Sequence, residues 1–208
     1  MSKFEKKFGK YAIHNLTMVL IMCYVAGYVI ELMGSAAGNN LLGFLTLDPY
    51  RILHGQIWRL VTWVIVPPDS LDIFTIIMLL FYYNLGTALE RTWGTYRYNV
   101  YIFSGMLFTF AGSFLCMGVL YLLTGGMATE TASVVFYSGS YAFSTYYINL
   151  SIFLAFAATY PDMQVLFMMV LPLKASWIAV AAAGIYIYSF ITGGLIEKIE
   201  IVISLILI

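Results

Sequence analysis

Long apolar runs, separated by short segments that contain proline, glycine or charged residues, form the main pattern of this chain. Five runs approach the length of a transmembrane helix, at about residues 13–33, 71–89, 98–123, 142–160 and 175–191. A helix needs about 20 apolar residues to cross the roughly 30 Å hydrocarbon core of a bilayer. The pattern therefore predicts an all-α polytopic membrane protein.

Residues 201–208 form a sixth apolar run that is too short to cross a bilayer. We expect it to be the start of a truncated sixth helix, which gives a bundle of about six transmembrane helices in one domain, 1–208. The first run, 13–33, exceeds the roughly 7–15 apolar residues of a signal-peptide core, so we expect it to be retained.

The segment between the first two predicted helices, about residues 34–70, has a different character. It mixes many apolar residues, including Trp58 and Trp63, with charged residues such as Asp48 and Arg59. It is too apolar for a solvated loop and too polar to span. Because tryptophan and tyrosine favour the headgroup level, we expect an interfacial segment in the outer leaflet.

Composition supports a membrane location. Sixty-two per cent of the residues are hydrophobic and 10% are charged, which a soluble domain of this length could not accommodate. Ten basic and ten acidic residues balance, so membrane lipids and not nucleic acid are the expected partners. Placing the N-terminus in the cytoplasm puts seven of the ten lysines and arginines inside, and this orientation is therefore predicted.

The sequence offers no pattern for a bound cofactor or metal. No cluster of cysteine, histidine and carboxylate residues has metal-ligand spacing, and no glycine-rich phosphate loop precedes a helix. Cys23 and Cys116 lie in apolar runs, where a disulfide is not expected. The chain has no internal repeat and almost no charge inside the predicted spans, which disfavours a small transporter as an alternative function.

Several short motifs follow one another in order. The first is Gly55-Gln56-Ile57-Trp58-Arg59-Leu60 in the loop, and the second runs from Gly86 to Arg97 at the end of the second predicted helix. Tyr160-Pro161-Asp162 and the segment 171–177 follow the fourth. Over about residues 55–177 the chain thereby resembles the rhomboid superfamily, including its derlin-like branch. The resemblance implies a rhomboid-like bundle with these scaffold residues: Trp58, Arg59, Gly86, Glu90, Arg91, Trp93, Gly94 and Arg97.

The residue types suggest how these motifs support the fold. Trp58 and Arg59 are expected to anchor the loop at headgroup depth. Glu90 is expected to accept hydrogen bonds from backbone amides or from Trp93, and Gly94 to allow the chain to reverse.

The catalytic pattern of the family is missing. Active rhomboids carry a Gly-x-Ser-Gly nucleophile motif on the fourth helix and a histidine on the sixth. Counting back from Pro161, Tyr146 stands where the serine would be, and no Gly-x-Ser-Gly occurs in the chain. His14 and His54, the two histidines, fall on opposite sides of the membrane, although a helix continuing past residue 208 leaves room for another. A serine nucleophile needs a nearby base, so we expect a pseudoprotease with no catalytic residue.

Polar residues inside a predicted span suggest where a partner binds. Tyr146, Asn149 and Ser151 are candidates for contact with a transmembrane client, and helix–helix hydrogen bonding is the alternative role. The expected function is client or partner binding in membrane-protein quality control or trafficking. An active intramembrane serine protease with displaced catalytic residues remains the main alternative. The expected compartment is a prokaryotic inner membrane, and the sequence does not define an oligomeric state.

Overall fold

The computed structural model describes residues 3–123, 129–141, 143–167, 171–194, 198 and 201–202. The elements within these ranges, in chain order, are α1 (Lys3–Phe8), η1 (Gly9–Tyr11), α2 (Leu16–Ala36), η2 (Leu42–Phe44), α3 (Pro49–Leu53), α4 (Arg59–Thr62), η3 (Trp63–Ile65), α5 (Ile73–Trp93), α6 (Thr95–Leu123), α7 (Thr129–Gly139), α8 (Tyr146–Thr159), β1 (Gln164–Phe167), β2 (Leu171–Lys174) and α9 (Ala175–Thr192).

Four helical stretches of the described chain are long and apolar enough to cross a membrane. They are Glu5–Ala36, Ile73–Trp93, Thr95–Leu122 and Ala175–Thr192. The first contains α2, and the others correspond to α5, α6 and α9. This confirms the prediction of a polytopic helical membrane protein.

The fourth expected helix differs from the sequence-based prediction. In place of a span over 142–160, α8 has 14 residues and begins at Tyr146. At about 1.5 Å per residue it extends about 21 Å, less than the thickness of a bilayer core. Of the expected helix at 201–208, only residues 201 and 202 are described, and both are helical. The remainder lies outside the described residues, so the count of six helices stays a prediction.

Helix α7 was not expected from the sequence. Nor was the antiparallel hairpin of β1 and β2, in which Gln164 pairs with Lys174 and Phe167 with Leu171. The hairpin occupies the place where a simple turn was expected between α8 and α9.

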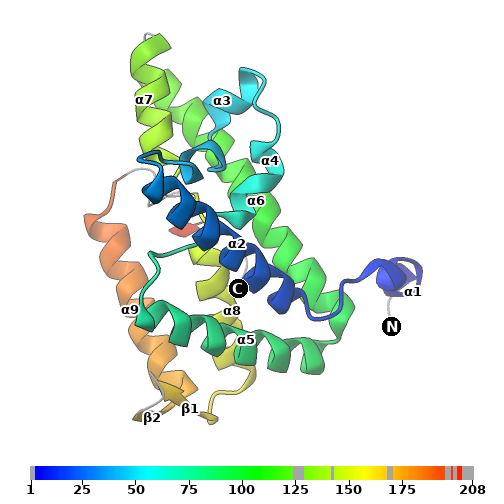
Figure 1. The fold of residues 1–208 in the computed structure, drawn as a ribbon. Helices are drawn as coiled ribbons and strands as arrows, with labels where there is room; N and C mark the ends of the chain where they lie inside the picture. The colour runs from blue at the N-terminus through cyan, green and yellow to red at the C-terminus, as the bar shows by residue number, and fades with distance from the viewer. Residues whose placement is uncertain are drawn as a thin grey trace.

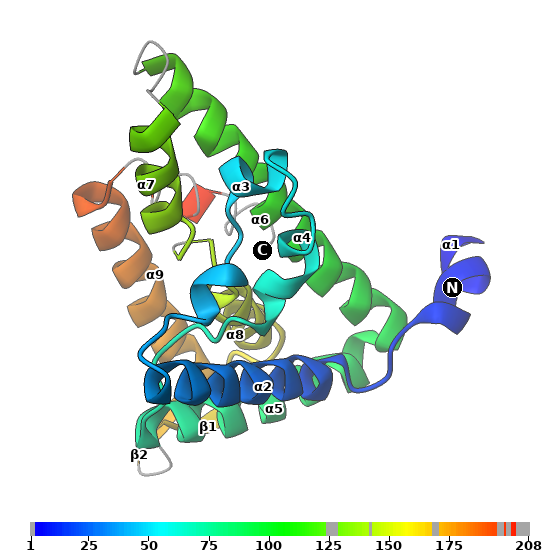
Figure 2. The ribbon, with the colours of Figure 1, turned by 45° about the horizontal axis from the view of Figure 1, so that its top comes forward.

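Helices α2, α5, α6, α7 and α9 form an approximately triangular frame around α8 (Figures 1 and 2). In Figure 2, α2 and α5 lie along one side of the triangle, α6 along the second, and α7 and α9 along the third. Helix α8 packs against both α5 and α9. Its side chains Ile148, Ile152 and Phe156 are at most 2% exposed, so the core of the protein is centred on this short helix.

Helices α2 and α5 are antiparallel. The start of α2 meets the end of α5 through Asn15 and Glu90, and the other end of α2 meets the start of α5 through Tyr28 and Asp69. We call the end of the bundle where Asn15 lies the N-terminal side. The opposite end, where the chain between α2 and α5 lies, is called the loop side.

The chain between α2 and α5 is a folded unit of short helices. Elements η2, α3, α4 and η3 all fall within residues 42–65, and α3 contacts both α6 and α7. Leu47, Thr46 and Asp48 in this segment are at most 1% exposed. The segment expected to lie in the membrane interface therefore has an interior of its own.

Candidate functional site

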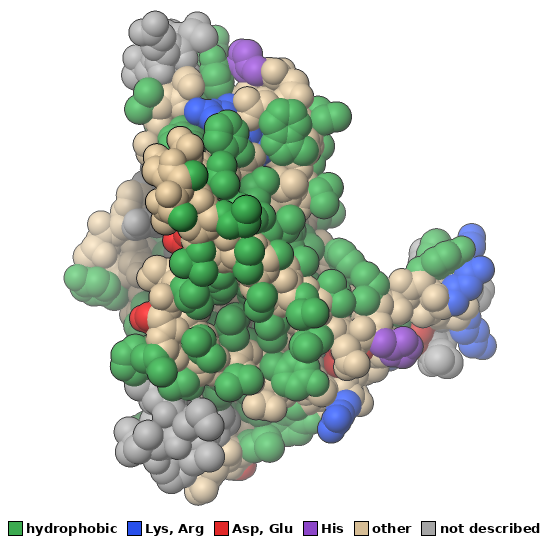
Figure 3. Space-filling model, in the orientation of Figure 1, with side chains coloured by type: hydrophobic (Ala, Val, Ile, Leu, Met, Phe, Trp, Pro, Cys, Tyr) green, Lys and Arg blue, Asp and Glu red, His purple; other side chains and the backbone are tan. Residues whose placement is uncertain are grey.

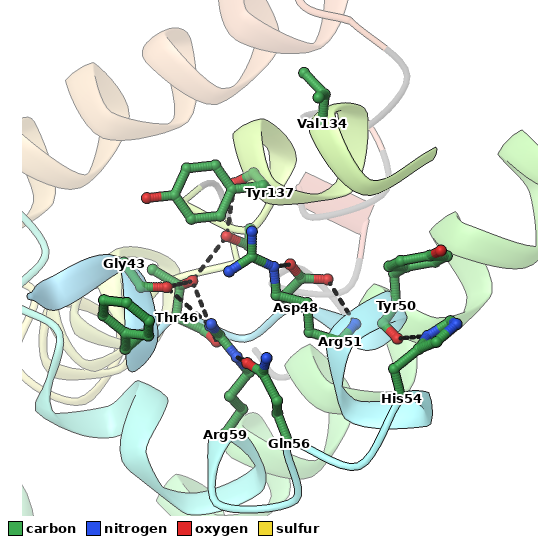
Figure 4. Close-up of polar contacts among 12 residues, drawn as sticks. Gly43, Thr46, Asp48, Tyr50, Arg51, His54, Gln56, Arg59, Val134 and Tyr137 are labelled. Carbon is green, nitrogen blue, oxygen red and sulfur yellow. Dashed lines mark hydrogen bonds and ion pairs between the residues drawn. The ribbon is translucent and has the colours of Figure 1, made fainter. Parts of the chain in front are cut away.

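Arg59 is the centre of the loop-side segment (Figure 4). Its side chain is completely buried, and its Nη1 donates to the carbonyl oxygens of Gly43 at 3.0 Å and Thr46 at 2.9 Å. Nη1 also lies 3.1 Å from Oγ1 of Thr46, and Nε donates to Oε1 of Gln56 at 2.7 Å. Because the guanidinium group offers five donors in a fixed plane, one side chain fixes two separate turns of the segment.

The same segment is attached to α7. Oγ of Ser140, at the end of α7, lies 2.9 Å from Oγ1 of Thr46, and the guanidinium of Arg51 lies 4.7 Å above the ring of Tyr137. Asp48 accepts from the backbone N–H of Arg51 at 3.2 Å and forms an ion pair with its Nε at 3.3 Å. Contacts between charged, aromatic and hydroxyl groups therefore join the loop-side segment to α7.

The position of Arg59 corrects one expectation. An anchor at headgroup depth would leave the guanidinium at the protein surface, whereas the structure encloses it in protein. Loss of solvation lowers the pKa of Arg59, and the nearby carboxylate of Asp48 opposes this shift. Trp58 is 48% exposed, and its Nε1 donates to the carbonyl oxygen of Phe44 at 3.2 Å. Of the Trp-Arg pair, only the tryptophan side chain is partly exposed.

On the N-terminal side, Gly86 marks a close approach of three helices. A Cβ atom at this position would collide with Oγ1 of Thr17 in α2 and would lie 2.6 Å from the hydroxyl of Tyr98 in α6. These two hydroxyl groups are 2.7 Å apart and share a hydrogen bond. The glycine at the end of α5 therefore allows α2 and α6 to meet through a buried polar contact.

Glu90 and Asn99 hold the start of α2. Oε1 of Glu90 accepts a hydrogen bond from the backbone N–H of Asn15 at 3.0 Å, and Asn15 has a left-handed φ of 54°. The amide of Asn99 both accepts from the N–H of Ile13 at 2.8 Å and donates to its carbonyl oxygen at 2.9 Å. Glu90 thus accepts from a backbone amide, as the sequence had suggested, but this amide belongs to the start of α2.

The other motif residues on this side surround the turn between α5 and α6. Gly94 has a φ of 85°, which favours glycine, and its N–H donates to the carbonyl oxygen of Glu90 at 2.9 Å. The ring of Trp93 meets that of Tyr101 edge to face with centroids 5.4 Å apart. Arg91 and Arg97 are exposed. Their positive charges therefore lie at the surface of the protein.

The candidate client-binding residues lie at the start of α8. Asn149 is 3% exposed, its Oδ1 accepts from the hydroxyl of Tyr24 at 3.4 Å, and its Nδ2 has no hydrogen-bond partner in the described part of the chain. Ser151 is fully buried, and its Oγ donates to the carbonyl oxygen of Ile148 at 2.8 Å. Tyr146 is 38% exposed. Of these three residues, only Tyr146 presents a substantial surface.

The described residues contain no group of three or more histidine, cysteine, aspartate or glutamate side chains that could hold a metal ion. Cys23 and Cys116 are free cysteines. His14 lies on the N-terminal side, where its Nδ1 is 3.3 Å from Oγ1 of Thr95, and His54 lies on the loop side, where its Nδ1 is 2.7 Å from the carbonyl oxygen of Tyr50. The two histidines are thus at opposite ends of the bundle.

The sequence did not reveal most of the partners of these motif residues. Thr46 and Asp48 are polar residues in an apolar stretch, which could have indicated internal hydrogen bonding. Thr17, Tyr98 and Asn99 gave no such signal, because each finds its partner more than 80 residues away in the chain.

The four candidate spans and the buried helical core define an integral membrane protein of the polytopic helical class. A family model described as "Eukaryotic integral membrane protein (DUF1751)" matches residues 15–206, and the chain belongs to this family. The expectation of a prokaryotic inner membrane was wrong, because the family is described as eukaryotic. Searches of curated proteins and of solved structures found no match.

Proposed function

We propose that this protein is a non-catalytic membrane protein of rhomboid-like fold that binds transmembrane segments of other membrane proteins, in quality control or trafficking. The observation that carries the proposal is the buried polar start of α8, at Asn149, beside a helix that is largely uncovered. An unpaired amide in a low-dielectric interior costs free energy, so it is more easily explained where a partner supplies the missing hydrogen bond.

Helix α9 supports a lateral route to this region. It packs on α8, and its side chains Ala175 and Tyr186 are at most 4% exposed. Other side chains on it, such as Val180 and Ile191, are at least 70% exposed. Alanine and glycine residues in its central part permit close approach by another helix, which favours packing in lipid.

The hydrogen bonds made by serines in the helices favour a role without catalysis. The hydroxyl groups of Ser104, Ser113 and Ser151 donate to the carbonyl oxygen three residues earlier in their own helices, each at 2.8 Å. This is the usual behaviour of serine in a helix and requires no catalytic explanation. The positions of His14 and His54 at opposite ends of the bundle also favour the non-catalytic role, since a serine nucleophile needs its base within hydrogen-bond reach.

Site-specific photocrosslinking in native membranes tests the proposal. A photoreactive amino acid replaces Tyr146, which is 38% exposed at the start of α8, and a control replaces Tyr83 in α5, which is 36% exposed. The expected result is a set of polypeptide adducts from position 146 that position 83 does not give. Absence of polypeptide adducts, or equal adducts from both positions, would contradict it.

A labelling experiment addresses the enzyme alternative. Full-length protein in detergent is treated with a serine-directed fluorophosphonate. The proposal predicts no label above that of heat-denatured protein. Labelling that one Ser→Ala change abolishes, together with cleavage of a single-pass peptide by the same protein, would overturn the non-catalytic assignment.

A further inference from the structure

A groove with a volume of about 590 Å³ runs between α2 and α5. Nine aliphatic or methionine side chains and two tyrosines line it. Its lining extends along α2 from Met18 to Leu32, which corresponds to about 21 Å of helix. Figure 3 shows hydrophobic side chains gathered over this face of the molecule.

The size of the groove favours a small amphiphile as its occupant. Sites for single small molecules have volumes of about 300–1,000 Å³, and this groove falls within that range. Its shape is long and its lining is apolar, which suits one acyl chain. A whole helix of similar length would occupy far more space than the groove provides.

The loop-side end of the groove is acidic. Leu71, a lining residue, lies between Asp69 and Asp72 in the sequence, and Leu32 directly follows Glu31. The hydroxyl of Tyr28, also in the lining, donates to the carbonyl oxygen of Asp69 at 2.9 Å. The carboxylate of Asp72 is held at the start of α5, where its Oδ1 accepts from the backbone N–H of Thr75 at 2.6 Å, and Glu31 lines a second cavity with Ser35 and Leu41.

No basic residue accompanies these carboxylates on the elements that form the groove. Residues 16–36 and 66–90 contain no lysine or arginine. Desolvation, with a further contribution from Asp72, raises the pKa of Asp69, as expected for a carboxylate without a neighbouring cation. An apolar channel with an unbalanced negative end is complementary to a lipid whose headgroup carries a positive charge.

We infer that the groove between α2 and α5 binds a membrane lipid with a primary ammonium headgroup, with one acyl chain along α2 and the ammonium beside Glu31, Asp69 and Asp72. A primary ammonium offers three N–H donors to these carboxylates. A lipid with an anionic headgroup would meet repulsion at the same place. None of the three candidate client-binding residues lines the groove, and the inference does not depend on the proposed client binding.

Native mass spectrometry of the delipidated full-length protein tests this inference. The protein is titrated with phosphatidylethanolamine and phosphatidylglycerol that carry the same palmitoyl and oleoyl chains. We expect the ethanolamine lipid to bind about fivefold more tightly or better, the ratio that one exposed ion pair can supply. Equal binding of the two lipids would show a non-selective lipid shell and would overturn the inference.

Two variants locate the site. Val25→Trp places a large side chain in the groove and is expected to abolish selective binding, whereas Val180→Trp, at a more exposed position on α9, is expected to leave it unchanged. The combined change Glu31→Gln, Asp69→Asn and Asp72→Asn is expected to retain lipid binding and remove the preference for ethanolamine. Thermal unfolding of each variant confirms that it is folded.

Other occupants would give distinct results. If the groove instead binds a second copy of the chain, a dimer peak will be lost in Val25→Trp and the lipid preference will not change. If it binds another polypeptide, a bound mass larger than a lipid will be lost in the same variant. Either result, or a preference that Val180→Trp removes as completely as Val25→Trp does, would overturn the inference.

Discussion

The carboxylate of Glu90 caps a helix to which it does not belong: its Oε1 accepts the backbone N–H of Asn15 at 3.0 Å, where α2 begins. Asn15 makes no side-chain capping bond of its own to α2. The end of α5 thereby supplies the negative group that the positive start of α2 favours. One side chain thus joins two helices through residues that are 75 positions apart in the sequence.

Removing the charge of Glu90 should weaken this contact. Glu90→Gln keeps an acceptor for the N–H of Asn15 but loses the charge, so we expect the free energy of unfolding to fall by about 1 kcal/mol. Glu90→Ala should lower it further. The free energy is measured by titrating the protein with sodium dodecyl sulfate in mixed micelles. The control is Asp162→Asn, which changes an acidic side chain that is 91% exposed and should have almost no effect.

Gly86→Ala should destabilise the protein by about 1–3 kcal/mol, because the added methyl group collides with Thr17 and approaches Tyr98. Gly118→Ala in α6 is the matched control. No atom lies within 4 Å of a Cβ there, so this change should be neutral or stabilising by at most about 1 kcal/mol. Equal effects of the two changes in the same unfolding measurement would show that helix propensity, and not the collision, dominates.

A double-mutant cycle isolates the cause of the Gly86 effect. Thr17→Ala alone should destabilise, because it breaks the hydrogen bond to Tyr98. In the Gly86→Ala background the same change removes the atoms that collide. We therefore expect the double variant to be more stable than the sum of the two single effects predicts.

Arg59→Lys should lower the free energy of unfolding by about 2–3 kcal/mol although the charge is retained. A lysine ammonium cannot reach Gln56 and the two carbonyl oxygens in the planar arrangement that the guanidinium uses. The control is Arg97→Lys, at an exposed position. Limited proteolysis of residues 42–65 provides a second measurement, and faster cleavage is expected only in the Arg59 variant.

The N-terminal cap of α5 should be sensitive to acid. Oδ1 of Asp72 accepts the N–H of Thr75 at 2.6 Å, and this bond lowers the pKa of Asp72 below its usual value of 3.8. The folded state therefore favours the carboxylate. Its contribution to stability is present above pH 3.8 and is lost as pH falls through the lowered pKa.

Comparison of wild type with Asp72→Ala measures this contribution. The difference in midpoint of thermal unfolding should be constant between about pH 5 and 7 and should shrink below about pH 4. In Asp72→Asn the amide oxygen remains an acceptor at every pH. The difference in unfolding midpoint between Asp72→Asn and Asp72→Ala should therefore persist in acid. A difference between wild type and Asp72→Ala that persists unchanged at pH 2 would contradict the cap as the cause.

The sequence predicted the elements whose formation depends on local composition. Apolar runs of sufficient length indicated α2, α5, α6 and α9, because hydropathy and length determine whether a helix can span. Helix α7 was missed because its sequence, with Glu130, Ser133 and Ser138, lacks the composition of a span. The hairpin before α9 was missed because its strands are only four residues long.

The contacts of the motif residues could not be predicted from the sequence. The motifs drew attention to Arg59, Gly86 and Glu90, yet what each side chain contacts depends on residues far away in the chain. Arg59 is buried because the carbonyl oxygens of Gly43 and Thr46, 16 and 13 residues earlier, accept its hydrogen bonds. Glu90 caps α2 because the start of that helix lies beside the end of α5. Such contacts depend on tertiary packing, which a sequence pattern does not encode.

The short length of α8 and its place at the centre of the frame have a consequence for biogenesis. A segment that covers about two thirds of the bilayer core, and that itself contains buried polar groups such as Asn149, is a poor substrate for independent insertion from the translocon. It gains a suitable environment only when α5 and α9 are present on either side. We therefore expect the maturation of this protein in the cell to include a late stage. At this stage, after synthesis of α9, an incompletely inserted intermediate packs its other helices around α8.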